Sequence, residues 1–229
     1  MSSGQCSIFP LGESAITVEF GREISVGLNE RAINVASYFE LNPFPGLIET
    51  TASYASVTLF YDPAVIRDEF DQFETAFDAI LSLISRALEE TDAHDFGTPE
   101  TVEIPVDFSA LSGPDLGEVS AFAGLETSDI IDVFTARIYR VYMLGFLPGF
   151  AYMGEVDPRV AIGRKATPRT KVPKGSVGIA GTQTGIYPLE SPGGWQIIGR
   201  TATEMFDPSA EEPCLLRPGD LVKFVDIRR

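Results

Sequence analysis

The residues best suited to binding a small molecule lie in the second half of the chain, in a stretch rich in glycine and proline. Arg164 and Arg169 flank a loop there, and a guanidinium group is suited to bidentate contact with a carboxylate or a phosphate. Neutral donors and acceptors follow, and the turn S191-P-G-G-W contains glycines that permit close approach of the backbone. The candidate substrate-binding residues are Arg164, Arg169, Gln183, Tyr187, Ser191 and Arg200. Their types predict a site for a small acid.

Charge is distributed unevenly along the chain. The formal net charge is -16, yet no acidic residue lies between Pro158 and Leu189, a stretch that contains six lysines and arginines. A basic segment in an acidic protein is a candidate site for an anion. The alternative is a solvated loop whose charges pair with acids elsewhere in the fold. For Trp195, Phe146 and Phe150, core packing is likewise the alternative to ligand contact.

Several kinds of chemistry find no support in the sequence. The single histidine, His94, lies in a polar segment that reads as a solvated linker, so a Ser-His-Asp or Cys-His arrangement is not expected. Cys6 and Cys214 lie near opposite ends of the chain, which fits two reduced thiols and supplies neither a disulfide framework nor a metal site. Phosphate-binding glycine motifs are missing, and the acidic balance argues against nucleic acid. Catalytic residues are not identified by these patterns.

Hydropathy argues against membrane insertion and secretion. No apolar run approaches the about 20 residues that a membrane span needs. The segment MSSGQCSIFPLGES lacks a basic stretch followed by an apolar one, so it does not resemble a secretory signal. We therefore expect a cytoplasmic location.

The first part of the chain predicts an α+β unit. Ile16, Val18 and Phe20 alternate with polar residues as in a strand, and Ser25 is a candidate N-cap for the helix that follows. Two short strands are expected at 47–53 and 55–61, the second with Val57, Leu59 and Tyr61 on one face. Asp62-Pro63 then starts an amphipathic pattern that predicts one helix to about Glu90. With a closing strand at 102–106, this order predicts a ferredoxin-like βαββαβ domain.

A second domain is expected after the polar segment 91–99, which gives boundaries of 1–98 and 99–229. Helical patterns appear around 116–123 and 128–138, with Thr127 as a candidate cap. From Tyr139 onward, brief apolar runs alternate with glycine and proline. Short strands with such turns and no long helix predict a closed barrel or a sandwich.

Long motifs in this chain resemble one protein family. The strings GFLPGFAYMG and PRTKVPKGSVGIAGTQTGIYPLESPGGWQIIGRT carry the resemblance, and FPLGESAITVEFG, PGLIET, YDP and RPGDLVKF extend it over almost the whole chain in the expected order. The family is variously called the 5-oxoprolinase B subunit, allophanate hydrolase subunit 1 or the kinase inhibitor KipI. The resemblance implies an N-terminal ferredoxin-like domain and a C-terminal cyclophilin-like β-barrel domain.

The same resemblance implies a protein that works beside partners in a hetero-oligomer. With a C subunit, built on a related barrel, and an A subunit, such a complex hydrolyses 5-oxo-L-proline to L-glutamate at the expense of ATP. The ATP site is expected to be shared with partner subunits or supplied by them, and no metal is implied. Arg164 or Arg169 would hold the substrate carboxylate, while Gln183 and Tyr187 would contact the lactam.

Two alternatives and one departure from the family pattern remain. The chain could serve a urea or allophanate type of carboxyl transfer or amide hydrolysis, or could bind a sensor histidine kinase as KipI-like proteins do. The departure is Phe134, which stands where many members have a histidine. A catalytic histidine would leave this chain impaired, whereas phenylalanine readily replaces a histidine of the core, which is the interpretation we favour.

Overall fold

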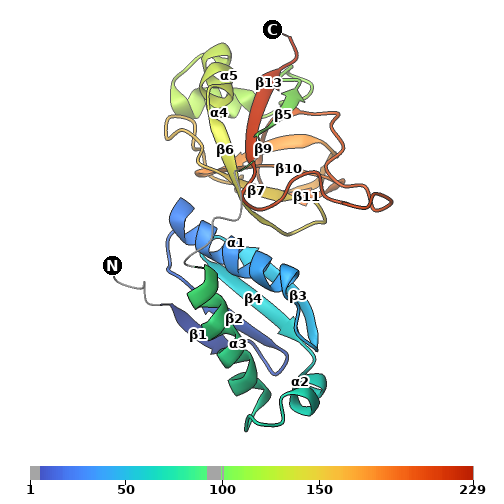
Figure 1. Ribbon diagram of the computed structural model, residues 1–229. Helices are drawn as coiled ribbons and strands as arrows, with labels where there is room; N and C mark the ends of the chain where they lie inside the picture. Colours follow the sequence, from blue (N-terminus) through green and yellow to red (C-terminus); the bar gives the residue numbers. More distant parts are fainter. Residues whose placement is uncertain (1–5, 92–98, 100, 229) are drawn as a thin grey trace. The chain divides into compact units, whose positions relative to one another are not determined.

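A computed structural model of the chain describes residues 6–91, 99 and 101–228. The chain divides into two compact units, residues 1–98 and residues 99–229 (Figure 1). The segment 92–98, which contains His94, and the N-terminal residues 1–5 lie outside the described residues, so the expectation for His94 stays a prediction.

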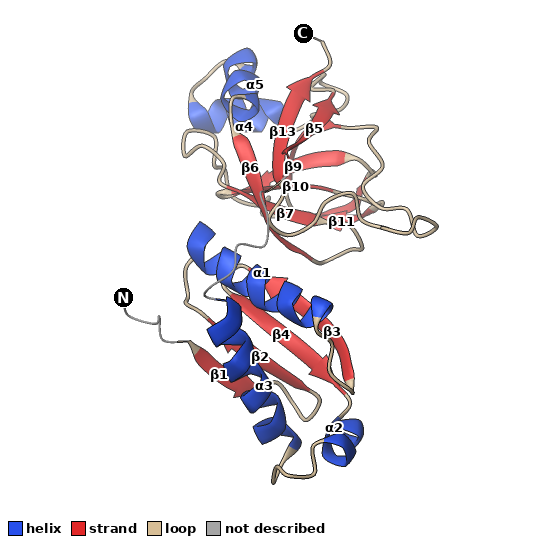
Figure 2. Cartoon of the chain, in the orientation of Figure 1, coloured by secondary structure: helices blue, strands red, loops and turns tan. Residues whose placement is uncertain are grey.

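The first unit is one antiparallel sheet with the helices α1 (Val26–Leu41) and α3 (Ala76–Thr91) packed on one of its faces (Figures 1 and 2). Its elements are β1 (Ser7–Pro10), β2 (Ala15–Glu19), α1 (Val26–Leu41), β3 (Leu47–Ser53), β4 (Ser56–Tyr61), α2 (Pro63–Glu69) and α3 (Ala76–Thr91). The strand order is β1-β2-β4-β3. In β4 the buried side chains are Val57, Leu59 and Tyr61, which confirms the expected alternation because successive strand residues point to opposite faces.

The prediction of one long helix after Asp62-Pro63 is wrong in one respect, because the structure has two helices there. The carboxylate of Asp62 caps α2, accepting hydrogen bonds from the amides of Ala64 and Val65. The chain then leaves the helical path until Thr75, whose hydroxyl accepts from the amide of Asp78 and donates to its carboxylate. This reciprocal cap starts α3. In the sequence, the apolar periodicity continues across the break and conceals the cap.

The second unit is built on a seven-stranded sheet with a helix pair beside it (Figure 2). Its elements are β5 (Thr101–Val106), α4 (Leu116–Ala123), α5 (Thr127–Thr135), β6 (Ile138–Leu144), β7 (Ala151–Gly154), β8 (Arg169–Val172), β9 (Ser176–Ala180), β10 (Gln183–Ile186), β11 (Ser191–Gly193), β12 (Gln196–Arg200) and β13 (Leu221–Asp226). The large sheet has the order β12-β9-β10-β7-β6-β13-β5, and β8 pairs with β11 in a small second sheet.

The seven-stranded sheet is nearly closed into a barrel. Asp107, directly after β5, and Arg200, at the end of β12, exchange backbone hydrogen bonds of 2.8 and 3.0 Å, so the two edge strands meet. Strand β5 pairs in parallel with β13, and the expectation that residues 102–106 close the first domain is therefore wrong. Two alternate apolar residues of β5, Ile104 and Val106, are buried in the barrel core.

Cys6, in the first unit, and Cys214, in the second, are both free cysteines. None of the helices that the structure describes combines the length and the hydrophobicity of a membrane span.

Candidate functional site

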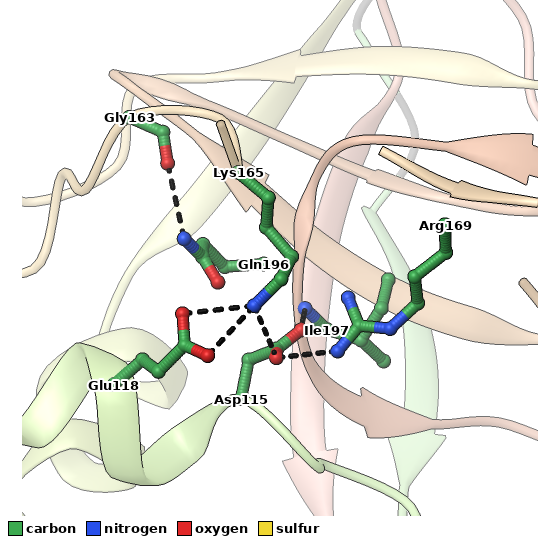
Figure 3. A network of polar contacts seen from close by, with 7 residues as sticks. All are labelled: Asp115, Glu118, Gly163, Lys165, Arg169, Gln196 and Ile197. Carbon is green, nitrogen blue, oxygen red and sulfur yellow. Dashed lines mark hydrogen bonds and ion pairs between the residues drawn. The ribbon is translucent and has the colours of Figure 1, made fainter. Parts of the chain in front are cut away.

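A buried carboxylate organises the basic segment of the second unit. Asp115, directly before α4, is only 1% exposed. Its Oδ1 atom accepts hydrogen bonds from Nζ of Lys165 at 3.0 Å and from Nη2 of Arg169 at 2.5 Å (Figure 3). Two cations of the basic segment thus converge on one acid that lies about 50 residues earlier in the sequence.

Backbone contacts fix this carboxylate in place. The amide of Asp115 donates to the carbonyl of Ile197 at 2.9 Å, and the amide of Ile197 donates to Oδ2 of Asp115 at 2.6 Å. Glu118, on α4, accepts from Lys165 through both carboxylate oxygens at 2.7 and 2.8 Å. The cluster therefore joins α4, β12 and the loop that precedes β8.

Electrostatics favour the charged forms of Asp115, Lys165 and Arg169. Burial by itself raises the pKa of Asp115, but hydrogen bonds from Arg169, Ile197 and Lys165 outweigh it and hold that pKa below its usual value. The hydrogen bond to Glu118 raises the pKa of Lys165, and the bond to Asp115 raises the pKa of Arg169. The site therefore keeps its two positive charges near neutral pH.

Two buried polar atoms beside the cluster have no hydrogen-bond partner among the described residues. One is a donor, Nη1 of Arg169, and the other is an acceptor, Oε1 of Gln196. Gln196 is 4% exposed, and its Nε2 donates to the carbonyl of Gly163 at 3.4 Å. Figure 3 shows the Arg169 guanidinium and the Gln196 amide entering the cluster on opposite sides of Lys165. Because buried polar groups are rarely left unpaired, each of these two atoms marks a place for a ligand group or an ordered water.

Aromatic side chains pack behind the small sheet of β8 and β11. Tyr187 is buried against Phe150, with ring centroids 5.3 Å apart, and Trp195 also packs on Phe150, edge to face. Burial raises the pKa of the Tyr187 hydroxyl, and the charges of Arg164 and Arg169 lower it in part. Phe150 and Trp195 thus fit the packing alternative. Phe146 differs, since it is 59% exposed and has a φ of 70°, a region that phenylalanine seldom occupies.

The small sheet brings three of the predicted site residues together. Arg169 on β8 pairs with Gly193 on β11, and Ser191 pairs with Val172. A Cβ atom at Gly193 would lie 2.3 Å from the Tyr187 hydroxyl, so glycine is needed for this close approach. Arg169, Tyr187 and Ser191 therefore share one region, although the Ser191 hydroxyl is engaged with the carbonyl of Pro192 at 3.2 Å.

The other three predicted residues do not join this buried cluster. Arg164 is exposed. Gln183 pairs with Ala180 at one end of β9, whereas Arg200 pairs with Ser176 at the other end, about 13 Å away at about 3.3 Å per strand residue. The backbone of Arg200 closes the barrel, and its Nε donates to the carbonyl of Lys174.

Sequence reasoning missed Asp115, Glu118 and Gln196. Lys165 was visible as part of the basic segment, but the acids that hold it lie 47 and 50 residues away. The only local sign of a role for Asp115 was its position immediately before a helical pattern, which is typical of an ordinary helix start. No group of His, Cys, Asp and Glu residues suited to a metal ion occurs in the described part of the chain.

Phe134 is a core residue. It is fully buried on α5 and packs against Phe108, Tyr139 and Phe224, with the Tyr139 hydroxyl donating to its carbonyl at 2.8 Å. These contacts fit the interpretation that residue 134 has a structural role in the core.

Comparisons with known proteins agree over most of the chain. Residues 6–216 match the family described as carboxyltransferase domain, subdomain C and D. The chain is 43% identical to the 5-oxoprolinase B subunit of Bacillus subtilis, covering 95% of this chain and 91% of the relative, and 38% identical to the protein of that name from Escherichia coli O157:H7, covering 98% and 97%. The crystal structure of TTHA0988 superposes with a TM-score of 0.80 at 36% identity over 93% of this chain, which spans 39% of that longer one.

Proposed function

The chain belongs to the family of the carboxyltransferase domain, subdomain C and D, and from its relatives within that family we propose that it is the B subunit of an ATP-dependent 5-oxoprolinase. The observation that carries this proposal is the similarity to the B subunits of 5-oxoprolinases, which extends over nearly the full length of both chains. The protein is not autonomous, and it acts with the A and C subunits to convert 5-oxo-L-proline to L-glutamate.

The reaction opens a stable lactam, which is uphill without activation. Transfer of a phosphoryl group from ATP to the lactam oxygen releases ADP and makes the ring carbon electrophilic. Water then attacks that carbon, the ring C–N bond breaks with protonation of the nitrogen, and hydrolysis of the resulting acyl phosphate releases phosphate. Fixed positive charge near the substrate stabilises the negative charge that develops at these oxygens.

The Asp115 cluster offers the groups that such a substrate needs. We assign Arg169 to the substrate carboxylate, because Asp115 holds its Nη2 while its Nη1 has no partner in the described structure. Gln196 supplies an unpaired amide oxygen for the lactam N–H, a role that the sequence assigned to Gln183. Tyr187 supports Arg169 and Gln196 from the aromatic cluster that it forms with Phe150 and Trp195.

We also propose a finer fold assignment for each unit. The sheet order of the first unit fits a ferredoxin-like arrangement in which β1, at the edge beside β2, occupies the position of the last strand. The second unit is assigned as a cyclophilin-like barrel. This likeness concerns the fold and carries no implication of prolyl isomerase activity.

Reconstitution tests the function. The purified chain is combined with the A and C subunits, and release of glutamate from 5-oxoproline is measured with and without ATP. We expect turnover only with ATP and with all three proteins present. Three intact proteins without turnover would contradict the proposal, and tight binding of a sensor histidine kinase by this chain alone would favour the KipI-like alternative.

Substitution of Arg169 tests the site. Arg169→Lys keeps a charge for Asp115 but removes the second guanidinium donor, so we expect the KM for 5-oxoproline to rise by about tenfold or more. Lys171→Ala is the matched control, since Lys171 lies two residues further on β8 and its side chain is 70% exposed. Equal KM values for both variants would exclude Arg169 from substrate binding.

A further inference from the structure

Five of the six cations in the basic segment of the second unit are paired with an acid. These pairs are Lys165 and Arg169 with Asp115, Arg159 with Asp157, Lys171 with Glu190, and Lys174 with Glu204. The sixth cation, Arg164, has no acidic partner among the residues that the structure describes, although the chain contains 33 acidic residues and only 17 basic ones. Arg164 is therefore the cation of this segment whose charge is available to a ligand.

The backbone on both sides of Arg164 is tied to the site. The carbonyl of Gly163 accepts a hydrogen bond from Nε2 of Gln196 at 3.4 Å, and the amide of Lys165 donates to the carbonyl of Gly194 at 2.7 Å. Figure 3 shows the first of these bonds beside Lys165. The side chain of Arg164 itself is exposed. A held stretch of backbone thus carries a guanidinium group that is open to a ligand.

Tyr187 connects Arg164 to the residues assigned to the substrate. The Tyr187 hydroxyl lies against Gly193, where an added Cβ atom would be 2.3 Å away, and Gly193 pairs with Arg169 across the small sheet. The charges of Arg164 and Arg169 both lower the pKa of this hydroxyl, so both guanidinium groups act on the same place. Arg169 approaches it from the buried cluster, and Arg164 approaches it from the exposed loop.

The two arginines suit different parts of the reaction. Asp115 holds Arg169 in place before any substrate binds, which suits a group that positions the substrate carboxylate. Phosphoryl transfer instead spreads negative charge over oxygens that move during the step. An unpaired guanidinium group stabilises such charge well, because it donates two parallel hydrogen bonds and loses no acid partner on binding. Arg164 is the residue of this segment with these properties.

We propose that Arg164 is a catalytic residue that contacts the phosphoryl group as it passes from ATP to the lactam oxygen. The inference rests on the proposed function and extends it to the step that consumes ATP. In this step the lactam oxygen bonds to the γ-phosphorus, while the bond from that phosphorus to the β–γ bridging oxygen breaks and ADP leaves with its electron pair. The ring nitrogen keeps its proton and carries the resulting positive charge. Only the charge of Arg164 is needed at the transferred group, so the role is compatible with a nucleotide bound by a partner subunit.

Substitution of Arg164 in the reconstituted complex tests this role. Arg164→Ala should lower kcat by about a hundredfold or more, because losing one group that stabilises transition-state charge costs about 10²–10³ in rate. The KM for 5-oxoproline should stay within about threefold of wild type, since Arg169 still holds the carboxylate. Arg164→Lys keeps the charge without the planar fork, so its kcat should lie between those of Arg164→Ala and wild type. ADP and glutamate release should fall together, and continued ADP release without glutamate would overturn the assignment.

Arg159→Ala is the matched control. Arg159 is an arginine of the same segment with a side chain that is 63% exposed, and its partner Asp157 keeps a second contact with Arg137 at 3.1 Å. We expect the kcat of this variant to stay within about twofold of wild type, because exposed ion pairs contribute little. Trp195 fluorescence verifies that both variants are folded. An equal loss in both would indicate a general effect of charge and would overturn the role of Arg164.

Binding of a transition-state mimic gives a readout that does not depend on turnover. Aluminium fluoride beside ADP imitates the phosphoryl group in transit, and calorimetric titration of the complex with 5-oxoproline present measures its affinity. Wild type should bind ADP more tightly with aluminium fluoride than without it. Arg164→Ala should lose at least about tenfold of this gain and keep its affinity for ADP alone. An equal gain in wild type and Arg164→Ala would refute the proposal.

The reconstituted enzyme separates this inference from the proposed function. A wild-type complex without turnover would contradict the function, and the role of Arg164 would fall with it. An active wild-type complex whose kcat is insensitive to Arg164→Ala would contradict the role of Arg164 alone. Gel filtration covers the remaining outcome, because loss of assembly with the A and C subunits in Arg164→Ala would make Arg164 a subunit contact and would also overturn the catalytic role.

Discussion

Asp115 is the residue whose substitution most directly tests the architecture of the site. In Asp115→Asn the shape of the side chain stays, and an oxygen still accepts from the amide of Ile197, but the negative charge between Lys165 and Arg169 is lost. Both cations are then left without their buried partner.

The size of the effect follows from burial. Removing one member of a fully buried ion pair costs about 3–5 kcal/mol. The Asp115 side chain is 2% exposed, but those of Lys165 and Arg169 are 18% and 29% exposed and keep some contact with water. We therefore expect the free energy of unfolding of the second unit to fall by about 2–3 kcal/mol.

The assay uses urea unfolding followed by the fluorescence of Trp195, the only tryptophan of the chain, which is buried in the second unit. Glu190→Gln is the control, because its ion pair with Lys171 is exposed on both sides and should contribute less than about 1 kcal/mol. A loss below about 0.5 kcal/mol in Asp115→Asn would refute the role given to this carboxylate.

The pH dependence gives a second readout for the same variant. The pKa of Asp115 is lower in the folded protein than in the unfolded chain. Its contribution to the free energy of unfolding is therefore present above the unfolded pKa of about 3.9 and is lost as the pH falls through the folded pKa. The stability difference between wild type and Asp115→Asn should therefore shrink in acid. A difference that stays constant down to acid unfolding would contradict the linkage.

Three further predictions concern the second unit. Phe134→Ala should lower the free energy of unfolding by about 3–5 kcal/mol, because the side chain is fully buried among aromatic rings; a loss below about 1 kcal/mol in urea unfolding would contradict this. Gly193→Ala should cost about 1–3 kcal/mol in the same assay, because its Cβ would meet the Tyr187 hydroxyl, whereas Gly194→Ala, with no atom nearer than 3.5 Å, should cost less. Burial raises the pKa of Tyr139 and Tyr187, so their stabilisation holds below the unfolded value of about 10 and fades above it; tyrosinate absorbance from both should rise only together with loss of near-ultraviolet circular dichroism.

Local sequence determined most elements of the fold. Alternation at Val57, Leu59 and Tyr61 and the cap at Asp62-Pro63 act over a few residues, so they could be read directly. The break between α2 and α3 was missed because the apolar period continues across it, while the deciding signal was the reciprocal cap of Thr75 and Asp78.

Pairing between distant strands was decided by the tertiary structure. Residues 101–106 have the pattern of a strand wherever they pair, and nothing in that pattern names β13 as the neighbour. Closure of the barrel through Asp107 and Arg200 joins residues 93 positions apart, so the role of Arg200 in the sheet could not be inferred locally.

The same distinction holds for the site. The sequence identified a basic segment and the residue types that bind anions, because these depend on composition alone. Which cations face a ligand depends on where acids of other elements lie, and Asp115 and Glu118 reach Lys165 and Arg169 only after α4 packs beside β12. Charge on a side chain is a property of the sequence, whereas its partner, its burial and hence its pKa are properties of the fold.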